Sequence, residues 1–154
     1  FDKKIQIRII KITLIIVWMV IVFCFSNQGG TKSSNTSRKV TVAVVQVVSD
    51  RTIEEDEPLL ENIEKIIRKL AHYTIYAVGG FLIMNYAYTT NRKTKEKVFY
   101  STAFGIGYAV TDELHQFFVV GRSASIFDVC IDALGIVTGI GIYVIMRKAI
   151  EIKQ

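Results

Sequence analysis

The third of four apolar stretches in the chain carries side chains that could act as acids, bases or ligands. Asp112, His115 and Gln116 are spaced at i, i+3 and i+4, which places them on one face of a helix. A carboxylate and an imidazole at this spacing could transfer a proton to or from a bound molecule. Glu113 lies about 100° away around the same helix. The segment therefore predicts a polar site within an otherwise apolar helix.

Two further apolar stretches carry polar residues at the same helical spacing. In the second stretch, Arg68, His72 and Tyr76 recur at every fourth position. In the fourth stretch, Asp128 and Asp132 do the same. We expect the three faces to converge on one polar pocket, with the turn between the third and fourth stretches at its rim. The candidate ligand-binding residues are Arg68, Lys69, His72, Tyr76, Asp112, Glu113, His115, Gln116, Arg122, Asp128 and Asp132.

An anion is the ligand that these side chains would favour. Arg68, Lys69 and Arg122 could hold a phosphate, because guanidinium and ammonium groups bind such anions well. An acid or base beside the bound anion would also be needed if the site were catalytic. The candidate catalytic residues are Asp112, His115 and Asp128.

Three other interpretations of the same residues are open. The charges could form ion pairs between helices, although polar contacts within bilayers average less than about 1 kcal/mol. The histidines and carboxylates could supply zinc ligands, but their spacing differs from the H-E-x-x-H of zinc hydrolases. Ser26 and Ser123 could be nucleophiles beside a histidine. We expect no metal and no other cofactor, and we expect Cys24 and Cys130 to be small packing residues in the first and fourth spans.

The four apolar stretches are each close to the ~20 residues that a helix needs to cross a bilayer. Hydrophobic residues make up 51% of the 154-residue chain, against 21% charged, and the mean hydropathy is +0.35. Helices of a soluble bundle would each need a polar stripe, which the first two stretches lack. The sequence therefore predicts an all-α integral membrane bundle that forms a single domain over residues 1–154. Its predicted transmembrane spans are residues 9–25, 70–88, 98–120 and 126–146.

The distribution of charge predicts the orientation of this bundle. If both termini are cytoplasmic, the inner segments are residues 1–11, 89–97 and 147–154. These segments contain 11 of the 19 Lys and Arg residues and few acids. Such an asymmetry follows the positive-inside rule. We therefore expect a multi-pass protein of the bacterial cell membrane with its N-terminus and C-terminus in the cytoplasm.

The connection between the first two spans, residues 26–69, is then outside the cell. Residues 40–48 within it are apolar and β-branched, which fits either a helix or a strand. In a membrane context we predict an amphipathic helix at the membrane surface. A further helix is expected to begin near Pro58, a residue suited to a first helical turn, and to continue into the second span.

The polar segments resemble those of the VanZ-like family of membrane proteins. Residues 68–76 match its RKxxHxxxY pattern, residues 112–128 match its DExHQxFxxxRxxxxxD pattern, and residues 25–28 match its FSxQ element. The family often carries Asn or Asp where this chain has Asp132. The resemblance implies a small multi-pass membrane protein, and the namesake of the family is linked to resistance to the glycopeptide teicoplanin.

Two classes of function fit the residues and the resemblance. The first is a non-enzymatic envelope protein whose outward-facing pocket binds an anionic lipid-linked headgroup, or a drug that targets one. The second is a membrane-embedded hydrolase or phosphotransferase that acts on a lipid phosphate. We favour the first class, because the resemblance implies antibiotic resistance and no defined reaction. The expected partners are membrane lipids, with a lipid-linked cell-wall intermediate or a glycopeptide as the specific ligand, and no nucleic acid.

Overall fold

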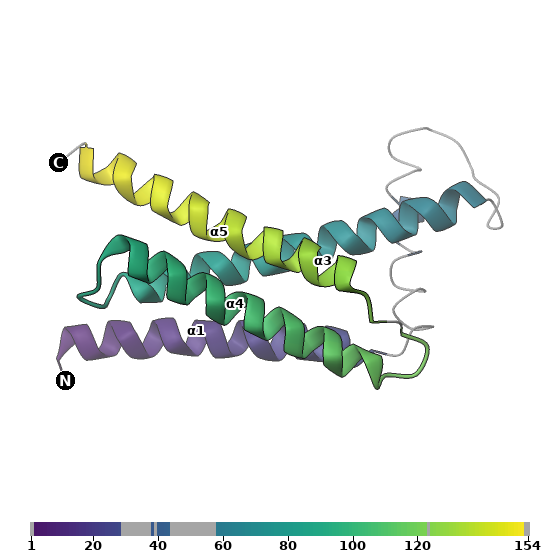
Figure 1. Ribbon diagram of the computed structural model, residues 1–154, viewed down its shortest axis with the longest axis horizontal. Coiled ribbons are helices and arrows are strands. Elements are labelled where there is room, and N and C mark those ends of the chain that lie inside the picture. The colour runs from purple at the N-terminus through teal and green to yellow at the C-terminus, as the bar shows by residue number, and fades with distance from the viewer. Residues whose placement is uncertain (1, 29–37, 39, 44–57, 123, 153–154) are drawn as a thin grey trace.

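In a computed structural model, the chain is all-helical over the residues that the structure describes, which are residues 2–28, 38, 40–43, 58–122 and 124–152. The four long helices are α1 (Lys3–Ser26), α3 (Pro58–Ala87), α4 (Thr94–Phe117) and α5 (Ile126–Ile152). Successive helices run in opposite directions, so both termini and the α3–α4 turn lie at one end of the bundle (Figure 1). The α4–α5 turn and the start of α3 lie at the other end. The prediction of an all-α fold is confirmed.

Local sequence signals explain how two of the helices begin. Asp2 caps α1, because its side chain accepts a hydrogen bond from the backbone N–H of Lys4 at 3.1 Å. The hydroxyl of Ser125 accepts one from the amide of Phe127 at 3.2 Å, at the first turn of α5. The preceding turn contains Gly121 with a φ of 78°, a left-handed conformation that favours glycine. This tight turn allows α4 and α5 to run antiparallel.

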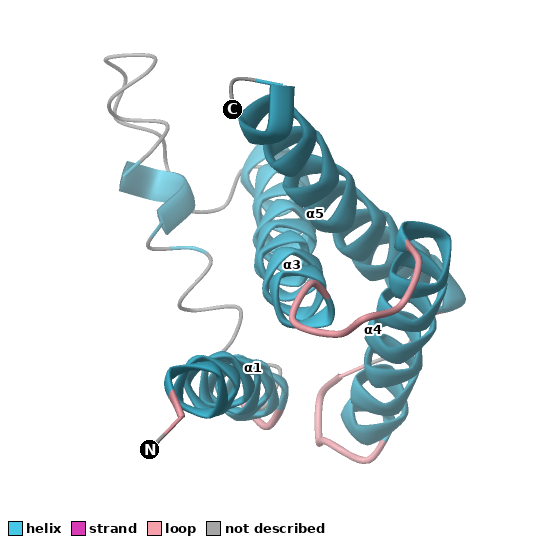
Figure 2. Cartoon of the chain, turned by 90° about the vertical axis from the view of Figure 1, so that its left-hand side faces the viewer, coloured by secondary structure: helices cyan, strands magenta, loops and turns pink. Residues whose placement is uncertain are grey.

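Helix α3 occupies the middle of the bundle, because it packs against α1, α4 and α5 (Figure 2). Its approach to α5 is close enough to require glycine on both helices. A Cβ atom at Gly139 of α5 would overlap the backbone of Ala77 in α3. A Cβ atom at Gly80 of α3 would overlap the backbone of Ile136 in α5. Small residues at such positions allow two helices to pack backbone against backbone.

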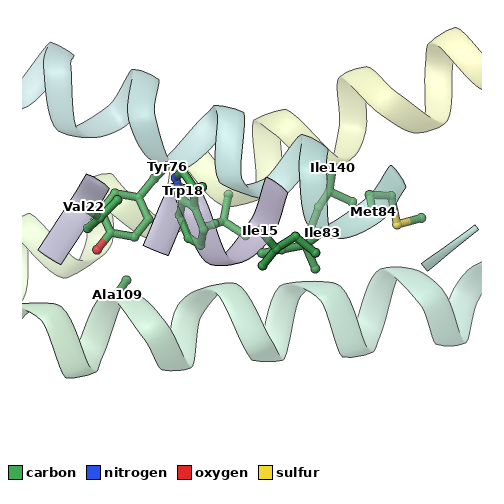
Figure 3. Packing of buried hydrophobic residues seen from close by; sticks show 9 residues of the cluster. Ile15, Trp18, Val22, Tyr76, Ile83, Met84, Ala109 and Ile140 are labelled. Atoms are coloured by element: carbon green, nitrogen blue, oxygen red, sulfur yellow. The ribbon is translucent and has the colours of Figure 1, made fainter. Parts of the chain in front are cut away.

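The hydrophobic core surrounds the single tryptophan of the chain (Figure 3). Trp18 of α1 is only 3% exposed, and its ring meets that of Tyr76 in α3 edge to face, with centroids 5.8 Å apart. The indole N–H of Trp18 donates to the carbonyl of Ile75 at 2.8 Å. The hydroxyl of Tyr108 in α4 donates to the carbonyl of Met19 at 2.7 Å. These two hydrogen bonds connect α1 to α3 and α4 within the apolar core.

The outer surface of the bundle is strongly apolar. Large hydrophobic side chains are exposed on all four helices, and Ile16, Leu70, Phe99 and Ile145 are examples. By length and composition, α1 and α5 are able to cross a membrane, whereas α3 and α4 do not meet that measure over the described residues. The structure therefore supports two of the four predicted spans by this measure. Together with the exposed apolar surface, these two helices indicate membrane association.

The connection between α1 and α3 is described only in part. Residues 38 and 40–43 are helical, and Thr41 is fully buried. The rest of the predicted amphipathic helix, residues 44–48, lies outside the described residues. The helix expected to begin near Pro58 is confirmed, because α3 runs without a break from Pro58 to Ala87.

Candidate functional site

A polar cavity of about 230 Å³ lies where α3, α4 and α5 meet, at the end of the bundle away from the termini. It is lined by both basic and acidic side chains. The basic residues in its wall are Lys65, Arg68, Lys69 and Arg122. The other polar or charged residues in its wall are His72, Glu113, Gln116, Asp128 and Asp132. The helices therefore bring together most of the candidate residues that the sequence predicts.

A second cavity of about 250 Å³ shares Arg68, His72 and Arg122 with the first. Its other lining residues are mostly apolar and include Val22 and Phe25 from the C-terminal part of α1. A charged compartment thus adjoins an apolar one. A ligand with a charged part and an apolar part would match this arrangement.

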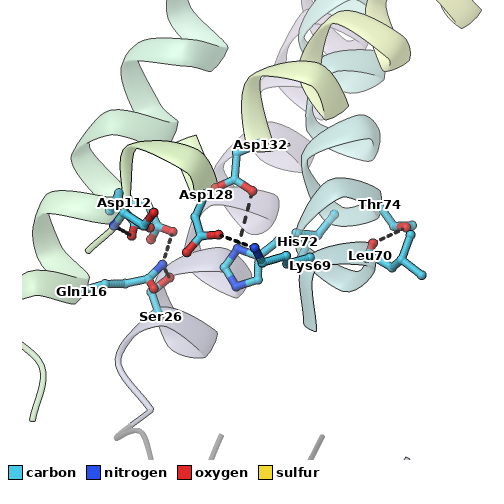
Figure 4. A network of polar contacts seen from close by, with 12 residues as sticks. Ser26, Lys69, Leu70, His72, Thr74, Asp112, Gln116, Asp128 and Asp132 are labelled. Carbon is cyan, nitrogen blue, oxygen red and sulfur yellow. Dashed lines mark hydrogen bonds and ion pairs between the residues drawn. The ribbon is translucent and has the colours of Figure 1, made fainter. Parts of the chain in front are cut away.

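At the inner wall of the polar cavity, His72 and Asp132 lie close to Asp112, which does not itself line the cavity (Figure 4). Nδ1 of His72 lies 3.5 Å from Oδ1 of Asp132. One potential ligand atom each from His72, Asp112 and Asp132 lies within 4.8 Å of the other two. Asp132 is fully buried, and Asp112 is only 4% exposed. We call these three residues the buried cluster.

The two carboxylates of the buried cluster differ in their hydrogen bonds. Oδ2 of Asp112 accepts a hydrogen bond from Nε2 of Gln116 at 3.0 Å. Nε2 of Gln116 also donates to the hydroxyl of Ser26 at 3.3 Å, so the network extends to the end of α1. Among the described residues, neither oxygen of Asp132 has a hydrogen-bond partner. Buried polar atoms rarely lack a hydrogen-bond partner, so we expect a further partner to bind at Asp132.

Lys69 and Asp128 form an ion pair at the more exposed edge of the cavity. Nζ of Lys69 lies 3.8 Å from Oδ1 of Asp128, and both side chains are partly exposed. Nζ also lies 4.4 Å from the centre of the Phe127 ring. A partly exposed ion pair contributes about 0–1 kcal/mol. Lys69 can therefore exchange this partner for a ligand anion at little cost in free energy.

A match to one sequence family spans most of the four helices and both cavities. A model of the VanZ/LLP1 family matches residues 11–147. The chain belongs to the VanZ/LLP1 family. The resemblance drawn from the sequence motifs is therefore confirmed, and the matched range includes every residue that lines the two cavities. No curated protein and no solved structure matches this VanZ-family chain.

Arg122 of the VanZ-family chain is bonded to the end of α1. Its guanidinium donates to the carbonyls of Phe25 at 3.0 Å and Gln28 at 3.1 Å, and to Oε1 of Gln116 at 2.9 Å. Carbonyls at the C-terminus of a helix lack partners within the helix, so a cation stabilises them. Burial, and then the charge of Arg68, lowers the pKa of Arg122 from its ordinary value, but an arginine remains protonated. Arg122 therefore anchors the α4–α5 turn to α1.

Three other candidate residues have surroundings that the sequence did not predict. His115 stacks on Phe23 of α1 with ring centroids 4.8 Å apart, and it is not part of the cavity lining. Glu113 lines the cavity and accepts a hydrogen bond from the amide of Ser125 at 2.7 Å, which stabilises the start of α5. Tyr76 is fully buried in the core, and its hydroxyl has no hydrogen-bond partner among the described residues. The placement of His115 gives no support to an acid–base role in the cavity.

The structure adds Lys65 to the candidate residues of this VanZ-family chain. Lys65 lines the polar cavity, and the sequence analysis missed it. It precedes Arg68 by three residues and Lys69 by four, so the helical spacing that identified the other candidates also contained this signal. With Lys65 included, one side of α3 presents three basic positions along the cavity.

Proposed function

We propose that this chain is a multi-pass protein of the bacterial cell membrane whose outward-facing cavity binds the anionic headgroup of a lipid. The main support for the proposal is that the polar cavity adjoins the apolar one. The two cavities share the lining residues Arg68, His72 and Arg122. A lipid has the same two parts, a charged headgroup and apolar chains. A free anion would need only the polar cavity and would leave the apolar one unexplained.

In this proposal all four long helices cross the membrane, including α3 and α4. Their charged residues contribute to the cavity lining, while Leu70 and Val78 of α3 and Phe99 and Leu114 of α4 are exposed on the outer surface. Polar residues within membranes almost always face the interior of the bundle or a cavity. The average hydropathy of α3 and α4 therefore understates how apolar their outer faces are.

The proposed orientation places both termini in the cytoplasm and the cavity outside. The four helices alternate in direction, so both termini lie at the same end of the bundle (Figure 1). Basic residues are concentrated at that end and in the α3–α4 turn, which favours the cytoplasmic side. The connection between α1 and α3, which includes the helical residues 40–43, would then lie outside the cell.

Arg68 is the residue best placed to bind the anion. It lines both cavities, and its buried Nε atom has no hydrogen-bond partner among the described residues. A guanidinium can bind a phosphate through two parallel hydrogen bonds. Lys69 would add a second charge, because its pairing with Asp128 is weak. Arg122 would contribute its charge while its hydrogen bonds continue to hold α1.

We propose a lipid-linked cell-wall intermediate as the specific ligand. Such a molecule carries phosphate next to a long apolar chain and is exposed at the outer surface of the membrane. Because glycopeptides act on this stage of cell-wall synthesis, a protein that binds the intermediate would alter susceptibility to teicoplanin. The family membership of the chain supports this cellular role.

The test is lipid binding by the purified full chain in nanodiscs. A fluorescent polyprenyl phosphate and a zwitterionic phosphatidylcholine of similar chain length are compared as ligands. We expect preference for the phosphate lipid and a loss of roughly tenfold or more in Arg68→Gln, in line with one lost charged hydrogen bond. Lys148→Gln is the matched control, since Lys148 is an exposed cation near the opposite end of the bundle.

Two results would contradict the proposal. Equal losses in Arg68→Gln and Lys148→Gln would mean that only overall charge attracts the lipid. Equal binding of the two lipids would mean that the cavity does not recognise an anion. Release of inorganic phosphate from the phosphate lipid would instead favour the alternative of a membrane-embedded phosphatase. The emission of Trp18, which is buried in the core, verifies that each variant is folded.

A further inference from the structure

We propose that the buried cluster of His72, Asp112 and Asp132 binds a divalent transition-metal cation of the zinc or manganese type. The three residues come from α3, α4 and α5, and one potential ligand atom from each lies within 4.8 Å of the other two. One imidazole nitrogen and two carboxylate oxygens form a donor set that both Zn²⁺ and Mn²⁺ accept. The sequence analysis left zinc ligands among the histidines and carboxylates open but expected no metal, because these residues follow no known metal motif.

The burial of Asp132 is the second observation in favour of a cation. Its side chain is fully buried, and among the described residues neither of its oxygens has a hydrogen-bond partner. A buried carboxylate is strongly unfavourable unless a positive charge or hydrogen bonds compensate it. Nδ1 of His72 lies 3.5 Å from Oδ1, which is longer than an ordinary N–H···O hydrogen bond. Asp112 brings a second carboxylate to the same place, so one divalent cation would compensate both.

The geometry needs only a small adjustment to coordinate a metal. Ligand atoms about 2.0 Å from a tetrahedral zinc ion are roughly 3.3 Å from one another. The separation of 3.5 Å between His72 and Asp132 is already close to that value. The ligand atoms of the cluster lie within 4.8 Å of one another, so Asp112 would have to move inward by up to about 1.5 Å. Gln116 already holds its carboxylate through a hydrogen bond of 3.0 Å. Ligand carboxylates in metal sites are commonly oriented by a second residue in this way.

The position of the buried cluster would leave part of the coordination sphere open. His72 and Asp132 both line the polar cavity, so a cation between them would face that space. Zinc sites with three protein ligands keep a fourth position for water or another molecule. The cation site goes beyond the proposed lipid binding and does not depend on it. If a lipid phosphate also enters the cavity, one of its oxygens could occupy the open position.

Metal binding by the full chain tests the proposal directly. The protein is purified in detergent without a histidine tag, stripped with EDTA and dialysed against Zn²⁺ or Mn²⁺, and the bound metal is counted by mass spectrometry. We expect one equivalent per chain and a loss of affinity of about tenfold or more in His72→Asn, Asp112→Asn and Asp132→Asn. Glu151→Gln is the matched control. Its carboxylate is exposed near the C-terminal end of α5, pairs with Arg147 and should leave metal affinity unchanged.

A stability measurement provides a second readout. Zn²⁺ should raise the melting temperature of the wild-type protein, because a ligand that binds the folded state stabilises it. Asp132→Asn should lose this increase. The melting temperature of this variant without metal is the baseline against which its response to Zn²⁺ is measured.

Two outcomes would overturn the proposal. The first is the absence of saturable binding at one cation per chain. The second is equal metal affinity in the wild type and Asp132→Asn. Either result would leave His72 and Asp132 as an ion pair only. Failure of the metal site and failure of lipid binding are distinguishable, since Arg68→Gln should retain the metal and lose the lipid.

Discussion

The replacement of Gly139 by alanine should force α3 and α5 apart. A Cβ atom at this position would lie 2.8 Å from both the carbonyl carbon of Ala77 and the amide nitrogen of Phe81, and closer still to the carbonyl oxygen of Ala77. These are backbone atoms of α3, which cannot rotate away as a side chain can. The added methyl group is therefore accommodated only if one whole helix shifts.

The magnitude follows from comparison with Gly141→Ala, which is the matched control on the same helix. A Cβ atom at Gly141 would meet no other atom within 4 Å. Both substitutions gain the higher helix propensity of alanine, which is worth up to about 1 kcal/mol and cancels in the comparison. Overpacking in a tightly packed core costs about 1–3 kcal/mol. We therefore expect the free energy of unfolding of Gly139→Ala to be lower than that of Gly141→Ala by about 1–3 kcal/mol.

The assay is unfolding in mixed micelles with increasing sodium dodecyl sulfate. Trp18 is the only tryptophan and is buried in the core, so its emission reports the loss of packing. Gly105→Ala should lie between the other two variants, because its Cβ would meet side-chain atoms of Ile136, at 2.7 Å, which can move. Unfolding of Gly139→Ala and Gly141→Ala at the same detergent fraction would refute the close α3–α5 contact.

Three further predictions concern single residues. Arg122→Lys should lower the free energy of unfolding by about 1–3 kcal/mol, because the lysine cannot keep all the hydrogen bonds to the end of α1; unchanged stability in mixed micelles would argue against the anchoring role. His115→Phe should leave binding of the polyprenyl phosphate unchanged, since it keeps the ring stack and lies outside the cavity lining; loss of binding in a folded variant would contradict this. In cells, and without the native cysteines, a cysteine at the exposed Ala124 should react with an impermeant thiol reagent and one at Thr94 should not. The reverse labelling would contradict the proposed orientation.

Helical spacing predicted which side chains reach the interior of the bundle where a residue lies at the centre of its helix face. Asp112 and Gln116 differ by about 40° around α4, and both reach the interior of the bundle. His115 lies about 60° from Asp112 on the other side, which makes it the edge of the same face. In the structure this edge meets Phe23 of α1 rather than the cavity. Spacing defines a face but does not identify the neighbour that covers each edge.

Other roles could not be predicted because the partner is the backbone. Arg122 donates to carbonyls of Phe25 and Gln28, and Glu113 accepts from the amide of Ser125. Every residue other than proline offers the same backbone groups, so no pattern of side chains indicates such contacts. The four long helices were predictable for the opposite reason. The high hydropathy of each apolar stretch comes from many side chains, so a few polar residues do not hide the pattern.

The charged residues of α3 and α4 lower the hydropathy of these helices. The charges around the cavity also favour a bound ligand over ion pairs alone as the explanation of the cavity. In a membrane, each charged residue near the centre of a helix costs about 2.5–3.5 kcal/mol on insertion scales. A polar contact between membrane helices returns about 0.6 kcal/mol on average. Ion pairs alone would therefore not compensate for the charges around His72 and Asp132. A bound cation or anion would supply the missing free energy, so a ligand is expected where Arg68 and His72 of α3 meet Asp132 of α5.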